Sequence, residues 1–237
     1  MNNLQGQKKS SPFSLSSKKA VILGASRGIG RAITLSLAQA GADLLIASRQ
    51  DDELNKIAAE AVSYGGNCHV CHVDISHQDD IAILVEKMQI TFDYIDLLVN
   101  CAGVSTGRKP FVTTDRTERD LIFNVNLFGA MDVMQAFAKI MIEQKGGSII
   151  NIASLGSIRG ISNLALYAAS KAAIQSLTKT FALEWAQYGI RVNAVAPGYV
   201  FTDMTRKIWT DQDLYNEYIK KIPLGRFAQP EEISPAV

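Results

Sequence analysis

A tyrosine and a lysine four positions apart, Tyr167 and Lys171, are the residues best placed to transfer a proton. Both lie in a stretch of helical pattern, and positions i and i+4 of a helix share one face, so the phenol and the ammonium would lie side by side. A neighbouring positive charge lowers the pKa of a phenol from about 10. Tyr167 would then act near neutral pH as an acid toward a carbonyl or as a base toward an alcohol. The alternative is an ordinary surface pair on an amphipathic helix.

Three glycines, Gly24, Gly28 and Gly30, lie between a short apolar run and a helical stretch. Glycine permits a tight turn and close backbone approach, and the helix that follows offers free N–H groups to a pyrophosphate. The spacing G-x3-G-x-G differs from the best-known dinucleotide fingerprint, but the strand–turn–helix context is the required one. We interpret this segment as a dinucleotide site, with a tight turn that binds nothing as the alternative.

The second apolar run ends at Ser48 and Arg49, where dinucleotide folds place the residue that distinguishes the two nicotinamide dinucleotides. A carboxylate there accepts from a ribose 2′-hydroxyl, whereas an arginine pairs with a 2′-phosphate. Arg49 and the turn residue Arg27 therefore predict that NADP(H) is preferred over NAD(H). The alternative is that both arginines are solvated and that Asp51 meets the ribose.

The elements that must position these residues follow a regular alternation of apolar runs and helical stretches. Such alternation is typical of βαβ units with a mainly parallel sheet, and near-continuous Val, Ile and Leu runs indicate helices on both faces. We predict a single doubly wound α/β domain over residues 18–237, preceded by a polar extension at 1–17. The six expected strands are 20–23, 43–47, 68–73, 95–99, 148–152 and 191–195, and helices end near 40 and cover 51–64, 77–91, 118–144 and 164–188.

Composition limits the class of protein. Of 237 residues, 47% are hydrophobic, which excludes a wholly disordered chain, and the formal charge of +1 gives no argument for nucleic acid or an anionic membrane. Charged residues interrupt every apolar run, and no apolar segment typical of a secretory signal follows the first lysines. Three cysteines suit a reducing compartment. We expect a cytoplasmic protein without nucleic-acid or membrane partners.

One motif is misleading. Cys68, Cys71 and His72 form a C-x-x-C-H pattern, which suggests haem attachment or zinc. The segment is a predicted strand, in which side chains alternate between faces, so the two cysteines would point to opposite sides. We therefore predict no metal site.

Four motifs in this order resemble the short-chain dehydrogenase/reductase family. They are the glycine turn, the segment Asn100 to Gly103, the pair Tyr167 and Lys171, and Pro197-Gly198. The resemblance covers about residues 13–237. It implies a Rossmann-like fold with a hydride-transfer site for a small carbonyl or alcohol substrate.

The resemblance also implies a catalytic set of Asn126, Ser154, Tyr167 and Lys171. In the family, the serine hydroxyl holds the substrate oxygen and polarises the carbonyl, and the asparagine supports a water in a proton relay with the lysine. For Asn126 the alternative is a helix-bending or solvated side chain.

The dinucleotide contacts implied by the family motifs come from the ends of several strands. Asp74 and Ile75 would form the adenine pocket, and Val200 and Thr202 would hold the carboxamide. Cys101 departs from the second asparagine that is usual in the family. The full expected cofactor set is Gly24, Ser26, Arg27, Gly28, Ile29, Gly30, Ser48, Arg49, Asp74, Ile75, Asn100, Ala102, Gly103, Tyr167, Lys171, Pro197, Gly198, Val200 and Thr202.

We predict an NADP(H)-dependent oxidoreductase that interconverts a ketone and a secondary alcohol. Residues 24–31 resemble 3-oxoacyl-thioester reductases, whereas the turn at Arg108, Lys109 and Pro110 is closer to sugar-acid and polyol dehydrogenases. A thioester reductase is the first expectation, a sugar-acid or polyol dehydrogenase using NAD(P) the alternative, and a nucleotide-sensing binding protein or a scaffold the non-enzyme alternatives. Arg108, Lys109 and Arg159 add positive charge near the mouth of the site.

Three further expectations follow from the resemblance. Residues 199–223 would form a substrate lid. The apolar helices 118–144 and 164–188 would build a homotetramer or dimer. The family continues beyond Val237 to a seventh strand, so we expect a truncated sequence with six strands.

Overall fold

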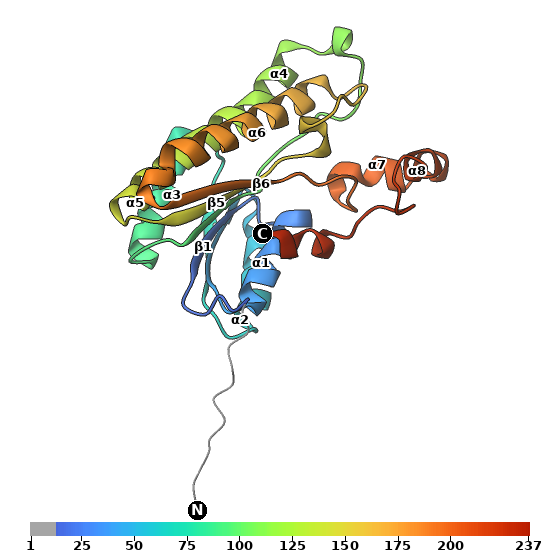
Figure 1. Ribbon diagram of the computed structural model, residues 1–237. Helices are drawn as coiled ribbons and strands as arrows, with labels where there is room; N and C mark the ends of the chain where they lie inside the picture. Colours follow the sequence, from blue (N-terminus) through green and yellow to red (C-terminus); the bar gives the residue numbers. More distant parts are fainter. Residues whose placement is uncertain (1–12) are drawn as a thin grey trace, which may run out of the picture.

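The computed structural model describes residues 13–237 and has a six-stranded, all-parallel sheet at its centre (Figure 1). The strand order is β3-β2-β1-β4-β5-β6. This confirms the predicted single α/β domain with a parallel sheet, and the strand ends differ from the prediction by one or two residues. The strands are β1 Lys19–Leu23, β2 Asp43–Ser48, β3 Cys68–His72, β4 Leu97–Asn100, β5 Gly147–Ile152 and β6 Ile190–Val195.

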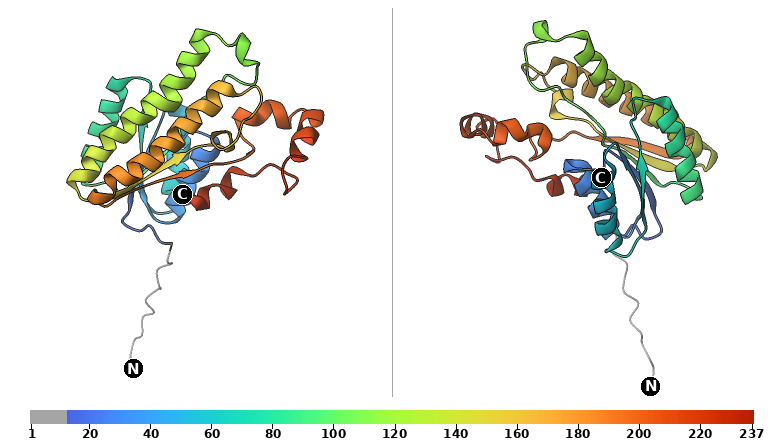
Figure 2. Two further views of the ribbon diagram at one scale, coloured as in Figure 1. Left: turned by 45° about the horizontal axis from the view of Figure 1, so that its top comes forward. Right: turned by 180° about the vertical axis from the view of Figure 1, so that it is seen from behind.

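Helices cover both faces of this sheet (Figure 2). Side chains alternate along each strand, so Val21 and Leu23 pack into one core while Ala20 and Ile22 pack into the other. The first core lies under α3, α5 and α6, and the second lies under α1 and α2. The helices are α1 Gly28–Gln39, α2 Asp51–Val62, α3 Gln78–Thr91, α4 Arg116–Phe123, α5 Ala130–Glu143, α6 Ala165–Trp185, α7 Arg206–Trp209 and α8 Gln212–Ile219.

The stretch expected as one helix over 118–144 contains a π-helical segment, Asn124–Gly129, between α4 and α5. A Cβ added to Gly129 would overlap the carbonyl oxygen of Ile75, so the backbone of this segment lies directly against the loop after β3. The whole run Arg116–Glu143 is long and apolar enough to cross a membrane by length and composition, contrary to the sequence expectation. Half of its most apolar window is buried inside the protein, which is usual for a core helix.

Part of the predicted N-terminal extension lies outside the described residues, namely 1–12. Residues 13–17 contact the domain: the Leu15 N–H donates to Ala40 O at 2.8 Å, and the Tyr94 hydroxyl donates to Ser17 O at 3.0 Å. The polar composition that suggested a free extension therefore does not prevent backbone pairing of its last residues.

The segment after β6 extends away from the sheet and carries α7 and α8 (Figure 1). An aromatic cluster anchors it, because the buried Phe227 ring packs against Tyr199, Phe201 and Tyr215 at centroid distances of 5.2 to 5.4 Å. Residues 226–232 include a short 3₁₀ turn, Pro230–Glu232. The remaining 3₁₀ turns are Phe111–Thr113, Leu155–Ser157, Ala186–Tyr188, Asp203–Thr205 and Ser234–Ala236.

Candidate active site

The glycine turn after β1 is a cradle in which backbone replaces side chains. Gly24 has φ +72°, and a Cβ there would lie 2.7 Å from the Ala102 nitrogen. Gly28 has φ +54°, and its Cβ would lie 3.1 Å from Thr202 Cγ2. The turn thus brings together three segments of the predicted cofactor set. The start of α1 has no side-chain cap and no acidic residue in its first turn, so its free N–H groups and positive dipole end suit an anion such as a pyrophosphate.

The end of β2 is tied to this turn, because Ser26 Oγ donates to Gln50 Oε1 at 3.0 Å. Each predicted phosphate-binding arginine is the chain neighbour of one of these two residues. Arg27 lies 3.7 Å from an Asp203 carboxylate oxygen, and Arg49 lies 3.4 Å from Asp74 Oδ2. Both guanidinium groups are at least half exposed, so the two ion pairs are weak and exchangeable.

The carboxylates near this edge have partners of their own. Asp51, the alternative ribose ligand, begins α2 and contacts His72 Nδ1 at 3.0 Å, while the Gln50 N–H donates to Ser48 Oγ. Burial disfavours the charge of Asp74, but hydrogen bonds from Ser76 and the nearby Arg49 outweigh it and lower the pKa of Asp74. Asp74 therefore stays ionised at the end of β3.

A buried polar ladder lies below the centre of the site. Asn100 Nδ2 donates to Asn151 Oδ1 at 3.3 Å, and Asn151 Nδ2 donates to Thr178 Oγ1 at 2.9 Å. These bonds cross from β4 through β5 to α6 and brace the sheet against that helix. Asn100 Oδ1 is buried and has no hydrogen-bond partner among residues 13–237, so it remains available as an acceptor.

Lys171 and Asn126 both approach one glycine. A Cβ at Gly103 would be 3.3 Å from Lys171 Nζ and 3.5 Å from Asn126 Oδ1. Asn126 exchanges two hydrogen bonds with the Val104 backbone, at 2.7 and 2.9 Å, and Lys171 Nζ donates to Ile152 O at 2.7 Å. Both side chains are buried, so the alternative of a solvated Asn126 is not what the structure has. The π-helical segment aims Asn126 at the loop after β4.

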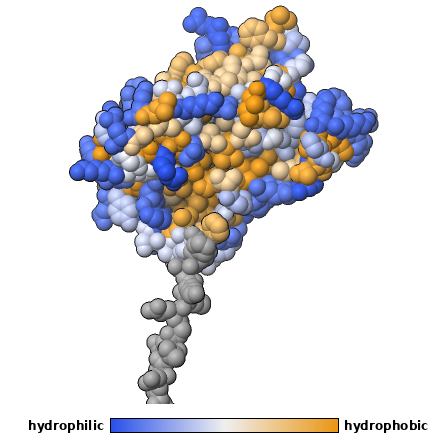
Figure 3. All heavy atoms as spheres, viewed as in Figure 1, coloured by the Kyte–Doolittle hydropathy of each residue, from blue (hydrophilic) through white to orange (hydrophobic). Residues whose placement is uncertain are grey.

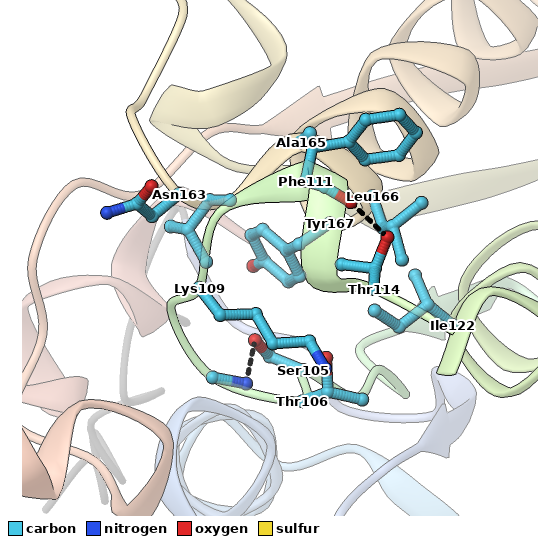
Figure 4. A pocket seen from close by; sticks show the side chains of 12 residues that line it. Ser105, Thr106, Lys109, Phe111, Thr114, Ile122, Asn163, Ala165, Leu166 and Tyr167 are labelled. Carbon is cyan, nitrogen blue, oxygen red and sulfur yellow. Dashed lines mark hydrogen bonds between the residues drawn. The ribbon is translucent and has the colours of Figure 1, made fainter. Parts of the chain in front are cut away.

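Tyr167 and Ser154 lie beside this pair. Tyr167 makes a hydrogen bond with Ser154, whose Oγ also accepts from the Gly156 N–H at 3.1 Å. Figure 4 shows the Tyr167 ring pointing into a pocket between the loop of Ser105 and Lys109 and the loop of Asn163. The four residues of the predicted catalytic set therefore come from the loop after β5, the π-helical segment and α6, and they meet beside the loop after β4.

Burial dominates the titration of these groups. It lowers the pKa of Lys171 to about 8, with Cys101 acting in the opposite direction. It raises the pKa of Tyr167 above its usual value, although the hydrogen bond with Ser154 opposes the rise. The sequence expectation was that Lys171 would lower the pKa of Tyr167. It differs from the structure because burial outweighs the hydrogen bond with Ser154, while Lys171 directs its ammonium at Ile152 O.

The motif after β6 closes the site from the side opposite β4. Pro197 O accepts from the Leu155 N–H at 2.8 Å, and Val200 is buried and bridged to Ala228. Thr202 lies against Gly28, whereas Gly198 is exposed. The position of Ile29 within the first turn of α1, and of Ala102 against Gly24, also agrees with the expected arrangement.

Four residues that support these positions were missed from the sequence. Thr205 Oγ1 donates to Val200 O at 2.5 Å, and Trp209 Nε1 donates to Thr202 O at 3.2 Å. Ser170 accepts from Asn126 Nδ2 at 3.1 Å, and Gln50 accepts from Ser26. Only Ser170 had a usable signal, since it is three residues from Tyr167 on the same helix.

The C-x-x-C-H segment is β3, as predicted. Cys68 packs against the core under α1 and α2, and Cys71 packs into the core on the other face. Within the described part of the chain, no group of three or more His, Cys, Asp or Glu side chains is arranged to hold a metal ion.

Comparisons with known proteins agree with this geometry. Residues 24–237 match the model of a family described as enoyl-(acyl carrier protein) reductase. The chain is 38% identical to a 3-oxoacyl-[acyl-carrier-protein] reductase of Thermotoga maritima over 94% of this chain and 89% of that protein. It is 33% identical to a gluconate 5-dehydrogenase of Gluconobacter oxydans over 93% of this chain and 86% of that protein.

Solved structures agree as well. A gluconate 5-dehydrogenase of Burkholderia cenocepacia, in complex with NADP and tartrate, superimposes with a TM-score of 0.89. It is 33% identical, and the match covers 94% of this chain and 88% of that one. With the glycine cradle, the motif order and these relatives together, the chain belongs to the short-chain dehydrogenase/reductase family of NAD(P)-binding oxidoreductases.

Proposed function

We propose that this protein interconverts a ketone and a secondary alcohol with NADP(H), using Tyr167 as the proton-transferring residue. The observation that supports this most directly is the meeting of Tyr167, Ser154, Lys171 and Asn126 beside the glycine cradle. The nicotinamide ring, when bound, supplies or accepts the hydride.

The residues of the chain would handle the oxygen and its proton. In reduction, the carbonyl oxygen accepts hydrogen bonds from Ser154 and Tyr167, and Tyr167 transfers its proton to that oxygen as the carbon gains the hydride. Lys171 and Asn126 then lie on the path by which Tyr167 regains a proton from solvent. In oxidation, the same groups act in reverse, with Tyr167 accepting the proton of the alcohol.

The dinucleotide would lie across the carboxyl ends of the strands. Gly24, Gly28 and Gly30 would admit the pyrophosphate, Asp74 and Ile75 would border the adenine, and Lys171 would also bind the nicotinamide ribose. Pro197, Val200 and Thr202 would hold the carboxamide. Arg27 and Arg49 would replace their weak carboxylate partners with a 2′-phosphate, which is a doubly charged ligand for the guanidinium fork.

The cofactor preference is tested by titrating the purified protein with NADPH and with NADH while following nicotinamide fluorescence. We expect NADPH to bind at least tenfold more tightly, since it can form charge-assisted hydrogen bonds that NADH lacks. Equal binding, or tighter NADH binding, would remove the proposed roles of Arg27 and Arg49.

The catalytic assignment is tested with Tyr167→Phe, which removes the transferable proton and keeps the ring. Turnover in a screen of carbonyl substrates with NADPH should fall by roughly 10²- to 10⁴-fold while NADPH affinity stays near the wild-type value. Tyr188→Phe, on a 3₁₀ turn beyond α6, is the matched control. A nucleotide-sensing protein without chemistry at this site would show no difference between the two variants.

Two classes of substrate are proposed. A 3-oxoacyl thioester is supported by relatives that are 3-oxoacyl-[acyl-carrier-protein] reductases, and a sugar acid by relatives that are gluconate 5-dehydrogenases. Residues 199–223 would cover either substrate as a lid, because they continue directly from the nicotinamide clamp and hold α7 and α8.

We also propose a homotetramer or dimer built through α5 and α6, in the cytoplasm. Leu183 on α6 is 82% exposed and Phe128 before α5 is 52% exposed, although both helices carry the core on their inner sides. Figure 3, which has the same view as Figure 1, shows apolar residues gathered across the middle of this face of the molecule. Light scattering should report a mass two or four times that of the chain, and Leu183→Glu should reduce it.

The three cysteines are all free thiols, in keeping with a reducing compartment.

A further inference from the structure

A cationic cavity lies beside the Tyr167 pocket. It has a volume of about 290 Å³ and is lined by Arg108, Arg159, Lys221, Tyr199, Tyr218 and Ile161, among others. No aspartate or glutamate is among the described residues that line it. Three positive side chains facing one space of this size favour an anion over a neutral ligand.

The three cationic side chains differ in how firmly other groups hold them. Arg108 is held in place, because it donates to Ser162 O at 3.1 Å and to the Tyr199 hydroxyl at 3.3 Å and lies over the Tyr218 ring. Lys221 pairs with Glu217 at 2.6 Å. Arg159 has no carboxylate partner anywhere in residues 13–237, so its guanidinium is uncommitted.

The cavity and the proton-transferring residues share their walls. Residues 159–162 lie in the chain between Ser154 and Tyr167. Gly107 and Lys109, the neighbours of Arg108, line the pocket that contains Tyr167 (Figure 4). The Lys109 N–H donates to Asn163 O at 3.0 Å, which fastens the two loops to each other. The cavity is therefore next to the pocket of Tyr167, although Tyr167 itself is not among the residues that line the cavity.

The chemistry of the lining selects the kind of anion. Ile161 is the only aliphatic side chain among the described lining residues, whereas tyrosine hydroxyls, backbone oxygens and the three cations supply polar contacts. The tyrosine rings leave apolar surface in the lining, but a hydroxylated carboxylate would also find donors for its anion and partners for its hydroxyls. The volume is at the lower end of small-molecule sites, which suits a ligand bound whole.

We propose that this cavity binds the carboxylate of a small polyhydroxy acid, with Arg159 as the residue that selects for the anion and Arg108 as the residue that shapes the cavity. The inference rests on the proposed function, since it places the reacting carbon of that acid at Tyr167. It narrows the substrate from ketones and alcohols in general to hydroxy acids and their keto forms.

The test compares D-gluconate with its neutral amide, gluconamide, as calorimetric ligands of the full chain saturated with NADPH, which cannot oxidise either ligand, so that the heat reports binding alone. We expect gluconate to bind more tightly, and Arg159→Gln to reduce that preference by roughly tenfold, the effect of losing a hydrogen bond to a charged group. Lys221→Gln should reduce it less, because Lys221 is shared with Glu217. Arg116→Gln and Lys220→Gln, on α4 and after α8, are matched controls outside the lining.

Several outcomes would overturn the inference. Equal affinity for gluconate and gluconamide would do so, as would absence of binding of both, or equal effects of Arg159→Gln and Arg116→Gln. Weakened reduction of a phosphopantetheine-linked 3-oxoacyl thioester in Arg159→Gln, with no change for the pantetheine-linked thioester and no preference for gluconate, would assign the cavity to the phosphate of an acyl carrier instead. Reduction of a neutral ketone with NADPH is measured in parallel. Its presence in the wild type separates a failure of this inference from a failure of the proposed function.

Discussion

Two groups of loops meet at the same edge of the sheet: those after β1 and β2, and those after β4, β5 and β6. The close contacts in the two groups are made by different parts of the chain. On the first side the close contacts are between backbone atoms, as at Gly24 against Ala102. On the second side they are between side chains and backbone, as at Lys171 with Ile152 and Arg108 with Ser162. On the first side there is no room for a β-carbon. On the second side the contacts depend on which side chain is present.

This difference separates what is general from what is particular in the molecule. A cradle made of backbone binds a group that is common to many enzymes, the pyrophosphate of a dinucleotide. A cavity lined with Arg159, Tyr218 and Lys221 can be altered one residue at a time without disturbing the sheet. Substrate choice is therefore expected to vary where the side chains are, and cofactor binding is expected to tolerate almost no change at its glycines.

Gly24→Ala tests the backbone side and should have the largest effect. The added Cβ meets the Ala102 backbone at 2.7 Å, and φ is +72°, so we expect a loss of about 2–4 kcal/mol of stability, a Tm lower by roughly 5–15 °C and loss of NADPH binding. The control is Gly65→Ala, where φ is +101° but nothing lies within 4 Å. It should keep NADPH binding. Equal losses in the two variants would mean that backbone strain alone, and not close approach, matters.

The pH dependence of reduction tests the side-chain side. The pKa of Lys171 is lowered to about 8, so its ammonium loses the proton as pH rises through 8 instead of through its usual range near 10.5. If the relay needs that proton, kcat/KM for reduction is present below pH 8 and falls about tenfold per unit above it. Lys171→Arg should move this limb upward, because a guanidinium keeps its proton. Lys179→Arg, exposed on α6, is the control, and an unmoved limb in Lys171→Arg would contradict the assignment.

Arg49→Gln tests a side chain on the nucleotide side. We expect NADPH to bind about tenfold more weakly, with NADH little changed, because only NADPH has the phosphate that pairs with the guanidinium. Arg31→Gln, whose side chain pairs with Glu60 at 2.6 Å, is the control. A parallel loss of NADPH and NADH affinity would indicate a structural role through Asp74.

Asp203→Asn should give the smallest change, and in the favourable direction. Asp203 lies 3.7 Å from Arg27, so its removal frees the guanidinium, and NADPH should bind about two- to fivefold more tightly at low salt. The gain should vanish at high salt, since the groups are exposed. Fluorescence titrations at the two salt concentrations check this, and a loss of affinity would show that Asp203 orders the loop instead of competing for Arg27.

The sequence predicted the elements better than the contacts between them. Most of the six strands were found because they are compact apolar runs, although β3 contains two histidines, and Tyr167 and Lys171 were found because they lie on one helix with a fixed spacing. The π-helical segment at Asn124–Gly129 was not predicted, since one extra residue in a helical turn leaves no trace in composition.

The contacts that were missed join distant parts of the chain. The pairing of Arg27 with Asp203 and of Gly28 with Thr202 depends on how the segment after β6 returns to the first turn, which no local pattern encodes. The sequence also did not predict the direction in which the pKa of Tyr167 shifts. That direction depends on whether burial outweighs the effect of a nearby charge. The Arg159 cavity required three loops to be placed together.

The strand order has a consequence for how the chain folds as it is synthesised. The first three strands, β1 to β3, form one half of the sheet with α1 and α2, and these can pair as soon as they have emerged. The other edge of β1 stays unpaired until β4 has been synthesised, because α3 comes between β3 and β4 in the sequence. β5 then pairs with β4, and β6 pairs with β5. An apolar strand with a free edge is prone to pair with other chains. We expect the half-made protein to be the form most dependent on chaperones, and arrival of β4 to be the step that covers the open edge of β1.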